Sequence, residues 1–209
     1  LFVASWFGYE QVVERGWFRT KRLREETNKL RLKWAYVMLK RDPRVSDAAM
    51  IANLLPSLSF YANTTIYIIA ALFAALGALD QLMSTASDLP FARVLSREAM
   101  ELKLLILIGV FVIAYFKFTW SLRQFNMLSL VVGAAPPPGE GGEADARRFA
   151  RINALSGDEF NRGIRAYYFG LAAVFWFIQP WMFVAVTTLI IGVLYRRDFR
   201  SQTLAAMQK

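Results

Sequence analysis

The sequence predicts an all-α integral membrane protein, a helical bundle with about four spans, the first one truncated, plus a long basic amphipathic cytoplasmic helix. Hydrophobic residues make up 56% of the 209-residue chain. A typical soluble domain has roughly 45–50%. The apolar residues gather in long runs, whereas the basic residues, which give a net charge of +9, gather between those runs.

The composition excludes several kinds of chemistry. The chain contains no histidine and no cysteine. Histidine-ligated haem or chlorophyll, thiolate zinc sites, iron–sulfur clusters and a Ser-His-Asp triad all need residues that it lacks. The carboxylates are scattered between the apolar runs. We therefore expect no enzymatic activity, no cofactor and no metal site.

Three apolar segments are long enough to cross the roughly 30 Å hydrocarbon core of a bilayer, which takes about 20 helical residues. They cover residues 54–79 (the second span), 100–120 (the third span) and 167–195 (the last span). A first span is expected to end within residues 1–13, because the chain opens with the short apolar stretch LFVASWFGY. We expect an upstream stretch to precede it, with a cleaved signal peptide as the alternative.

The last span contains Gln179-Pro180 near its middle. A single long, tilted helix that kinks at the proline is the preferred interpretation. Two short arms of a hairpin are the alternative.

The basic residues outside the spans indicate the orientation, because short cytoplasmic loops are rich in Lys and Arg. Residues 14–44 hold eleven of them and residues 121–166 hold six, so both segments are expected in the cytoplasm. The loop 80–99 holds two against three acidic residues and is expected outside. Four spans would also put the tail, residues 196–209, outside, although that tail is basic.

Residues 14–44 are predicted to form the basic cytoplasmic helix, which Asp42-Pro43 ends. Its apolar and aromatic side chains favour a location on the membrane surface or against another helix rather than on nucleic acid. Residues 121–166 are predicted as a cytoplasmic loop with a Pro/Gly linker at 134–143. A short amphipathic helix follows the linker, and Ser156-Gly157 is expected to end it.

Polar residues in or beside the spans are the candidate sites. Lys117 is interpreted either as a cation that lines a pore or as a side chain that reaches the cytoplasmic head groups. Lys103, at the other end of the third span, is explained by a local charge pair or a water-exposed rim. The candidates for a polar helix-packing or pore face are Asn63, Thr64, Lys117, Ser121, Gln124 and Asn126.

A second group of residues consists of basic side chains expected to contact anionic lipids. Arg162 and Arg165 are one helical turn apart and are candidates to grip a phosphate group. An ordinary positive-inside anchor is the alternative. The whole group is Arg22, Lys29, Lys33, Arg162 and Arg165.

Four stretches of the chain resemble a family of uncharacterised multi-spanning membrane proteins of bacteria and plants, catalogued as domain of unknown function 599. They are NLLPSLSFYANTTI (53–66), ELKLLILIGVFVIAYFKFTWSLRQFN (101–126), FNRGIRAYYFGLAAVFWFIQPW (160–181) and LYRRDFRS (194–201). The resemblance implies a helical membrane protein with about four spans, and it implies no catalytic residue.

The expected function is that of a non-enzymatic accessory or structural subunit of a membrane assembly or a homo-oligomer, in the bacterial inner membrane. An oligomeric channel or small-solute transporter is the alternative. Expected partners are anionic membrane lipids and other membrane subunits or copies of the chain, but no nucleic acid.

Overall fold

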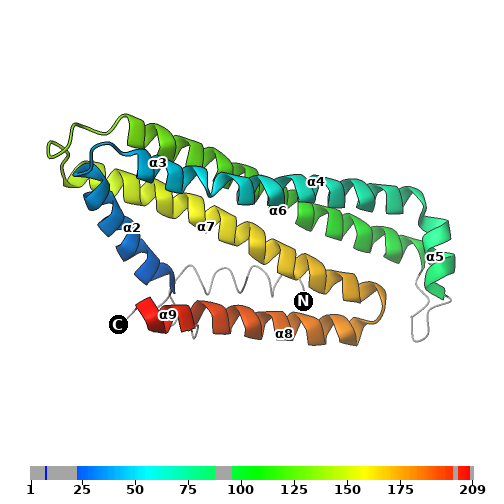
Figure 1. The fold of residues 1–209 in the computed structure, drawn as a ribbon. Helices are drawn as coiled ribbons and strands as arrows, with labels where there is room; N and C mark the ends of the chain where they lie inside the picture. Colours follow the sequence, from blue (N-terminus) through cyan, green and yellow to red (C-terminus); the bar gives the residue numbers. More distant parts are fainter. Residues whose placement is uncertain (1–7, 9–22, 88–95, 200–201, 208–209) are drawn as a thin grey trace. The chain divides into compact units, whose positions relative to one another are not determined.

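The computed structural model describes residue 8 and residues 23–87, 96–199 and 202–207 (Figure 1). Every regular element in these residues is helical, so the predicted all-α class is confirmed. Most of the predicted first-span end (1–13), residues 14–22 of the basic helix and residues 88–95 lie outside the described residues. The elements are α2 (Leu23–Leu39), α3 (Val45–Ala52), α4 (Leu55–Gly77), α5 (Leu79–Ser87), α6 (Arg97–Gly133), α7 (Glu143–Val174), the 3-10 helix η1 (Phe175–Phe177), α8 (Pro180–Phe199) and α9 (Gln202–Met207).

Two helical stretches are long and apolar enough to cross a membrane, judged by length and composition. They are Val45–Gly77, which comprises α3 and α4, and Arg97–Gly133, which is α6. These stretches contain most of the expected second span and the expected third span. A bundle with four spans stays a prediction.

The last apolar stretch, residues 167–195, is divided between two helices, so the preferred single kinked helix is wrong. α7 ends at Val174, η1 follows, and the chain turns back into α8 at Pro180 (Figure 1). Pro180 is the first residue of α8, where its missing N–H leaves no helical hydrogen bond unmade. The residue before a proline is also biased away from helical geometry, and Gln179 accordingly lies in the turn.

Within the expected cytoplasmic segment 121–166, the helices extend well beyond the one short amphipathic helix that was predicted there. α6 continues to Gly133, α7 begins at Glu143, and residues 134–142 connect them. Ser156-Gly157 lies inside α7 and does not end it. Phe125 of α6 and Phe149 of α7 are buried in one common core, which stabilises both helices in this segment. Likewise, α5 occupies residues 80–87 of the expected external loop.

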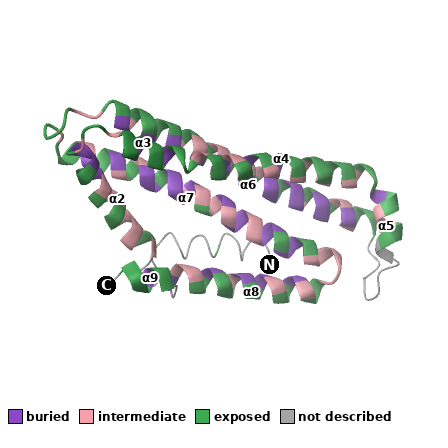
Figure 2. Ribbon diagram, viewed as in Figure 1, coloured by how far each residue is buried: buried purple, intermediate pink, exposed green. Residues whose placement is uncertain are grey.

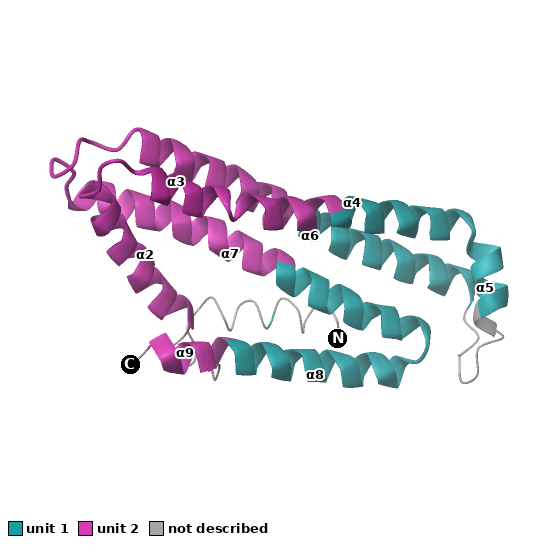
Figure 3. Cartoon of the chain, in the orientation of Figure 1, with its two compact units in different colours: residues 1–20, 64–115, 164–197 teal, residues 21–63, 116–163, 198–209 magenta. Residues whose placement is uncertain are grey.

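The chain divides into two compact units (Figure 3). Unit 1 comprises residues 1–20, 64–115 and 164–197, and unit 2 comprises residues 21–63, 116–163 and 198–209. Helices α4, α6 and α7 contribute residues to both units.

Unit 2 has a core built from five helices. α2 contributes Ala35, Met38 and Leu39, whose spacing puts them on one helix face. Figure 2 shows buried positions along α6 and α7 as well. Trp34 packs edge-on against the Phe149 ring at 5.0 Å. The other core members are Ile51 of α3, Leu58 of α4, Phe125, Leu128 and Val132 of α6, and Ala146 and Phe149 of α7.

Unit 1 has a smaller core cluster and exposes large apolar side chains. Leu79, Met100 and Leu104 form the buried part of that cluster. Tyr67, Trp181 and other large side chains of this unit are exposed. Residues 64–79, 104–115 and 166–195, which make up most of unit 1, contain no charged side chain. Extensive exposed apolar surface of this kind marks a protein or membrane contact.

Candidate functional site

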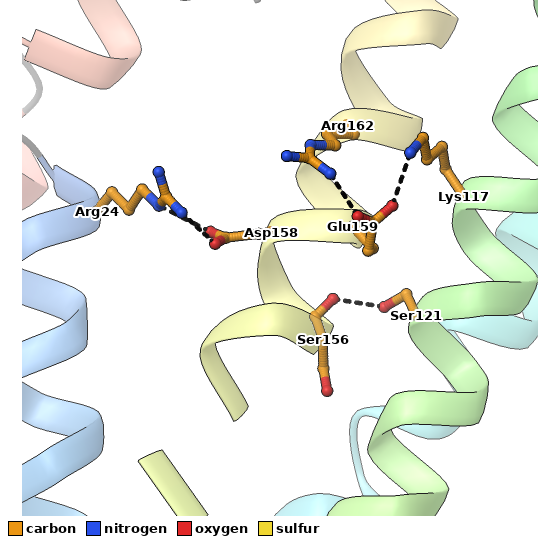
Figure 4. A network of polar contacts seen from close by, with 7 residues as sticks. All are labelled: Arg24, Lys117, Ser121, Ser156, Asp158, Glu159 and Arg162. Atoms are coloured by element: carbon orange, nitrogen blue, oxygen red, sulfur yellow. Dashed lines mark hydrogen bonds and ion pairs between the residues drawn. The ribbon is translucent and has the colours of Figure 1, made fainter. Parts of the chain in front are cut away.

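A polar cluster in unit 2 joins α6 to α7 (Figure 4). Lys117 Nζ of α6 lies 3.0 Å from Glu159 Oε2 of α7. One turn along each helix, Ser121 Oγ donates a hydrogen bond of 2.7 Å to the carbonyl oxygen of Ser156. Lys117 and Ser121 are four residues apart, so both face α7. From the first contact to the second, the residue number rises on α6 and falls on α7, as expected for antiparallel helices.

Glu159 is the carboxylate of this cluster that pairs with two cations. Its other carboxylate oxygen accepts a hydrogen bond from the Arg162 guanidinium (Figure 4). The Glu159 side chain is 12% exposed, whereas that of Lys117 is 33% exposed. An unpaired carboxylate at this depth would be costly, and two cations offset that cost. The cluster therefore contains a buried, paired carboxylate and no free acid or base.

A second carboxylate on α7 connects that helix to α2. Arg24 Nε and Nη2 bind the two carboxylate oxygens of Asp158 at 3.1 and 2.6 Å (Figure 4). Arg31 lies beside them, and a Cβ on Gly157 would lie 2.3 Å from its Nη2. Burial lowers the pKa of the Arg31 guanidinium, and the nearby Asp158 carboxylate acts in the opposite direction. Gly157 thus makes room for an arginine and does not end the helix.

An aromatic group also interlocks α4, α6 and α7 in unit 2. The Phe118 ring is fully buried. It stacks on Tyr61 with a centroid distance of 5.3 Å and lies 5.7 Å from the Phe160 ring. A Cβ added to Gly163 would lie 2.5 Å from the Phe118 ring. The absence of a side chain at Gly163 therefore allows Phe118 to approach α7.

Unit 1 contains a buried cation, Lys103, for which the sequence offered a local charge pair or a water-exposed rim. Lys103 is 6% exposed, and its Nζ donates a hydrogen bond of 2.7 Å to the carbonyl oxygen of Trp176. The ammonium also lies 5.0 Å from the Trp176 ring and 5.8 Å from the Phe177 ring. Trp176 and Phe177 belong to η1, just after the C-terminal end of α7, where a cation is favoured. Lys103 therefore fixes the turn between α7 and α8.

The predicted polar helix-packing or pore face is not one continuous surface. Lys117 and Ser121 belong to the polar cluster described above, whereas Asn63 and Asn126 are exposed and Thr64 is half-buried. The Gln124 Oε1 atom is buried and accepts no hydrogen bond from any described residue. On α4 it is the neighbouring Thr65 that is buried, and its hydroxyl lies 2.6 Å from the Tyr167 hydroxyl.

The predicted lipid-contacting residues have different environments. Arg22 lies outside the described residues. Lys29 and Lys33 of α2 are exposed. Arg162 is engaged by Glu159, and Arg165 is 6% exposed. The Arg162 side chain is still 27% exposed, and binding of a phosphate group by Arg162 and Arg165 stays a prediction.

Sequence reasoning missed Glu159, Asp158 and Lys103 as structural residues. Glu159 and Arg162 are three residues apart, a spacing that puts two side chains on one face of a helix. This spacing indicates an ion pair only if the segment is known to be helical. The Lys117–Glu159 pair depends on the packing of α6 against α7. In the described part of the chain, no group of three or more Asp or Glu residues is placed to hold a metal ion.

The fold and the polar cluster define an all-α protein with helices able to cross a membrane. The chain belongs to the family described as "Protein of unknown function, DUF599", which matches residues 1–203. The resemblance inferred from the four sequence stretches is thereby confirmed. No curated protein and no solved structure matches the chain.

Proposed function

We propose that the chain is a multi-pass protein of the bacterial inner membrane that acts as a non-enzymatic structural or accessory subunit of a membrane assembly or homo-oligomer. The main support for this proposal is that polar side chains of α6 bind groups on α7. Lys117 pairs with Glu159, and Ser121 binds the Ser156 carbonyl. A pore would present such groups to water, whereas these groups join two helices of the same chain.

The composition of each unit supports the membrane location. The uncharged stretches of unit 1 suit hydrocarbon, and their exposed apolar side chains suit lipid or neighbouring helices. α8 has 20 residues. At about 1.5 Å per residue, a helix of this length extends roughly 30 Å, the thickness of a bilayer core. Unit 2 contains most of the charged side chains and suits the cytoplasmic side.

The pairing of carboxylates supports a role in packing rather than in catalysis. Asp158 is held by Arg24, and Glu159 by Lys117 and Arg162. Asp47 is fully buried and accepts hydrogen bonds from Trp34 and Arg41. A general acid or base needs access to a substrate proton, and these carboxylates are engaged in ion pairs within unit 2.

The proposal is tested on protein purified from its native membrane in mild detergent. We expect native mass measurement to give a defined complex, either a homo-oligomer or a fixed ratio with other subunits. After reconstitution, wild-type protein and Lys117→Ala are expected to release potassium or chloride no faster than protein-free liposomes, because Lys117 lies in an ion pair. Arg123→Ala, which removes an exposed cation from the same helix, is the matched control.

Two results would overturn the proposal. A monomer without co-purifying subunits would contradict a structural role in an assembly. Ion release by the wild type that changes with Lys117→Ala, but not with Arg123→Ala, would favour the channel alternative.

A further inference from the structure

α2 has two apolar faces, and one of them packs into the core that the described residues of unit 2 form. Ala35, Met38 and Leu39 are buried in the core. On another side of the helix, Tyr36 is 39% exposed and Val37 is 44% exposed. An exposed apolar face on an amphipathic helix is typical of a surface that binds a partner or a membrane.

The open face is a hollow with an apolar floor and lysines along its edges. Its residues recur every three or four positions, so they form one stripe along α2. None of them is acidic. Lys29 pairs with Glu26 at 2.9 Å, whereas Lys33 and Lys40 form no ion pair with any described residue. The stripe, which we name the lysine face, consists of Lys29, Leu32, Lys33, Tyr36, Val37 and Lys40.

We propose that the lysine face binds the surface of a membrane that contains anionic lipids. Lysine stems can lie along apolar surface while their ammonium groups meet lipid phosphates. Tyr36 and Val37 would then enter the boundary between head groups and acyl chains, as the apolar face of an interfacial helix does. This inference rests on the proposed membrane location of the chain.

The apolar floor distinguishes this surface from a site for free phosphate or nucleic acid. Nucleic-acid binding is favoured by cations along a phosphate backbone, but it gives no reason to expose Tyr36 and Val37 between them. A lipid surface binds both the cations and the apolar side chains, because it offers anionic charge and an apolar layer within a few ångströms. The combination on one helix face therefore favours lipid.

The absence of cysteine from the chain allows a direct test, because Val37→Cys provides a single labelling site. An environment-sensitive fluorophore at this position is measured in nanodiscs of phosphatidylcholine, with or without phosphatidylglycerol. We expect a blue shift and loss of quenching by aqueous iodide only with phosphatidylglycerol. Lys29→Gln/Lys33→Gln/Lys40→Gln should lower the ratio of docked to undocked label about a hundredfold, given roughly a fivefold effect per lysine.

The matched control removes the same charge from exposed positions on α7 of unit 2. Arg147→Gln/Arg148→Gln/Arg151→Gln should keep the blue shift, because these arginines lie outside the lysine face. Equal thermal unfolding temperatures of the two triple variants would show that both fold.

Three results would overturn the inference. They are an equal response of the label in both lipid mixtures, no response in either mixture, and an equal loss of the response in both triple variants. Each excludes a specific contact with anionic lipid. Retention of the protein in nanodiscs after a urea wash separates this failure from that of the proposed function. A chain that the wash removes contradicts the membrane location, whereas a retained chain with an unresponsive label contradicts the lysine face alone.

Discussion

Replacing Gly163 with alanine is expected to lower the free energy of unfolding by about 2 kcal/mol, the middle of the range for overpacked cores. The new Cβ would lie 2.5 Å from the Phe118 ring. That ring is fully buried and packed against Tyr61 and Phe160, so it has little room to move. Thermal or denaturant unfolding in mild detergent measures the change.

Gly109→Ala is the matched control for this substitution. Gly109 is also helical, on α6, and a Cβ there would meet no atom within 4 Å. Alanine at such a site should be neutral or stabilise by up to about 1 kcal/mol, the difference in helix propensity. Adding Phe118→Leu to Gly163→Ala should recover part of the loss. Equal stability of Gly163→Ala and Gly109→Ala would contradict the close packing of Phe118 on α7.

Lys103→Met is expected to lower the free energy of unfolding by about 1–3 kcal/mol, because a carbonyl loses its charged hydrogen-bond donor. Methionine keeps most of the length and apolar volume of the side chain. It removes the 2.7 Å hydrogen bond to the Trp176 carbonyl and the contact of the ammonium with the Trp176 ring. Relief of the cost of burying a charge offsets part of the loss. Unfolding in mild detergent measures the net change.

Arg123→Met is the matched control for Lys103. Arg123 also lies over a tryptophan ring of α6, at 5.7 Å from Trp120, but it is exposed. An exposed cation–π contact contributes only about 0.5–1 kcal/mol, so this variant should stay close to the wild type. If the two variants lose the same stability, Lys103 does not fix the turn after α7.

The all-α class and the two longest apolar helices were predictable from the sequence, because hydropathy is a property of local composition. The extension of α6 and α7 beyond those apolar runs was not predictable from the sequence. Residues 121–133 lie beyond the apolar run of the third span and residues 143–166 are rich in charge, yet both segments are helical and pack Phe125 and Phe149 into a shared core. Such packing depends on residues distant in the sequence.

The turn at Pro180 shows a different limit. Gln179-Pro180 was recognised as a break in the last apolar stretch, but proline is compatible with both a kink and a helix start. The ammonium of Lys103, contributed by a distant part of the chain, binds the Trp176 carbonyl next to this turn. The turn therefore depends on a tertiary contact that the local sequence does not contain.

The candidate site was predictable in part. The spacing of Lys117 and Ser121 correctly placed both side chains on one face of a helix. Their partners were not predictable, since Glu159 and Ser156 lie on a different helix whose existence at those positions was missed. Gly157 was misinterpreted for the same reason, because its contact with Arg31 is visible only in three dimensions.

The most direct test of Lys117 as a link between helices is a double-mutant cycle with Lys117→Gln and Glu159→Gln, measured as free energies of unfolding in mild detergent. Because Lys117 is one-third exposed, solvent screening reduces the expected coupling to about 1 kcal/mol. The same cycle on the exposed pair Arg147 and Glu143, on α7, should give less than about 0.5 kcal/mol. Coupling of about 1 kcal/mol between Lys117 and Glu159 would support the joining of α6 to α7. Coupling no larger than that of Arg147 and Glu143 would contradict it.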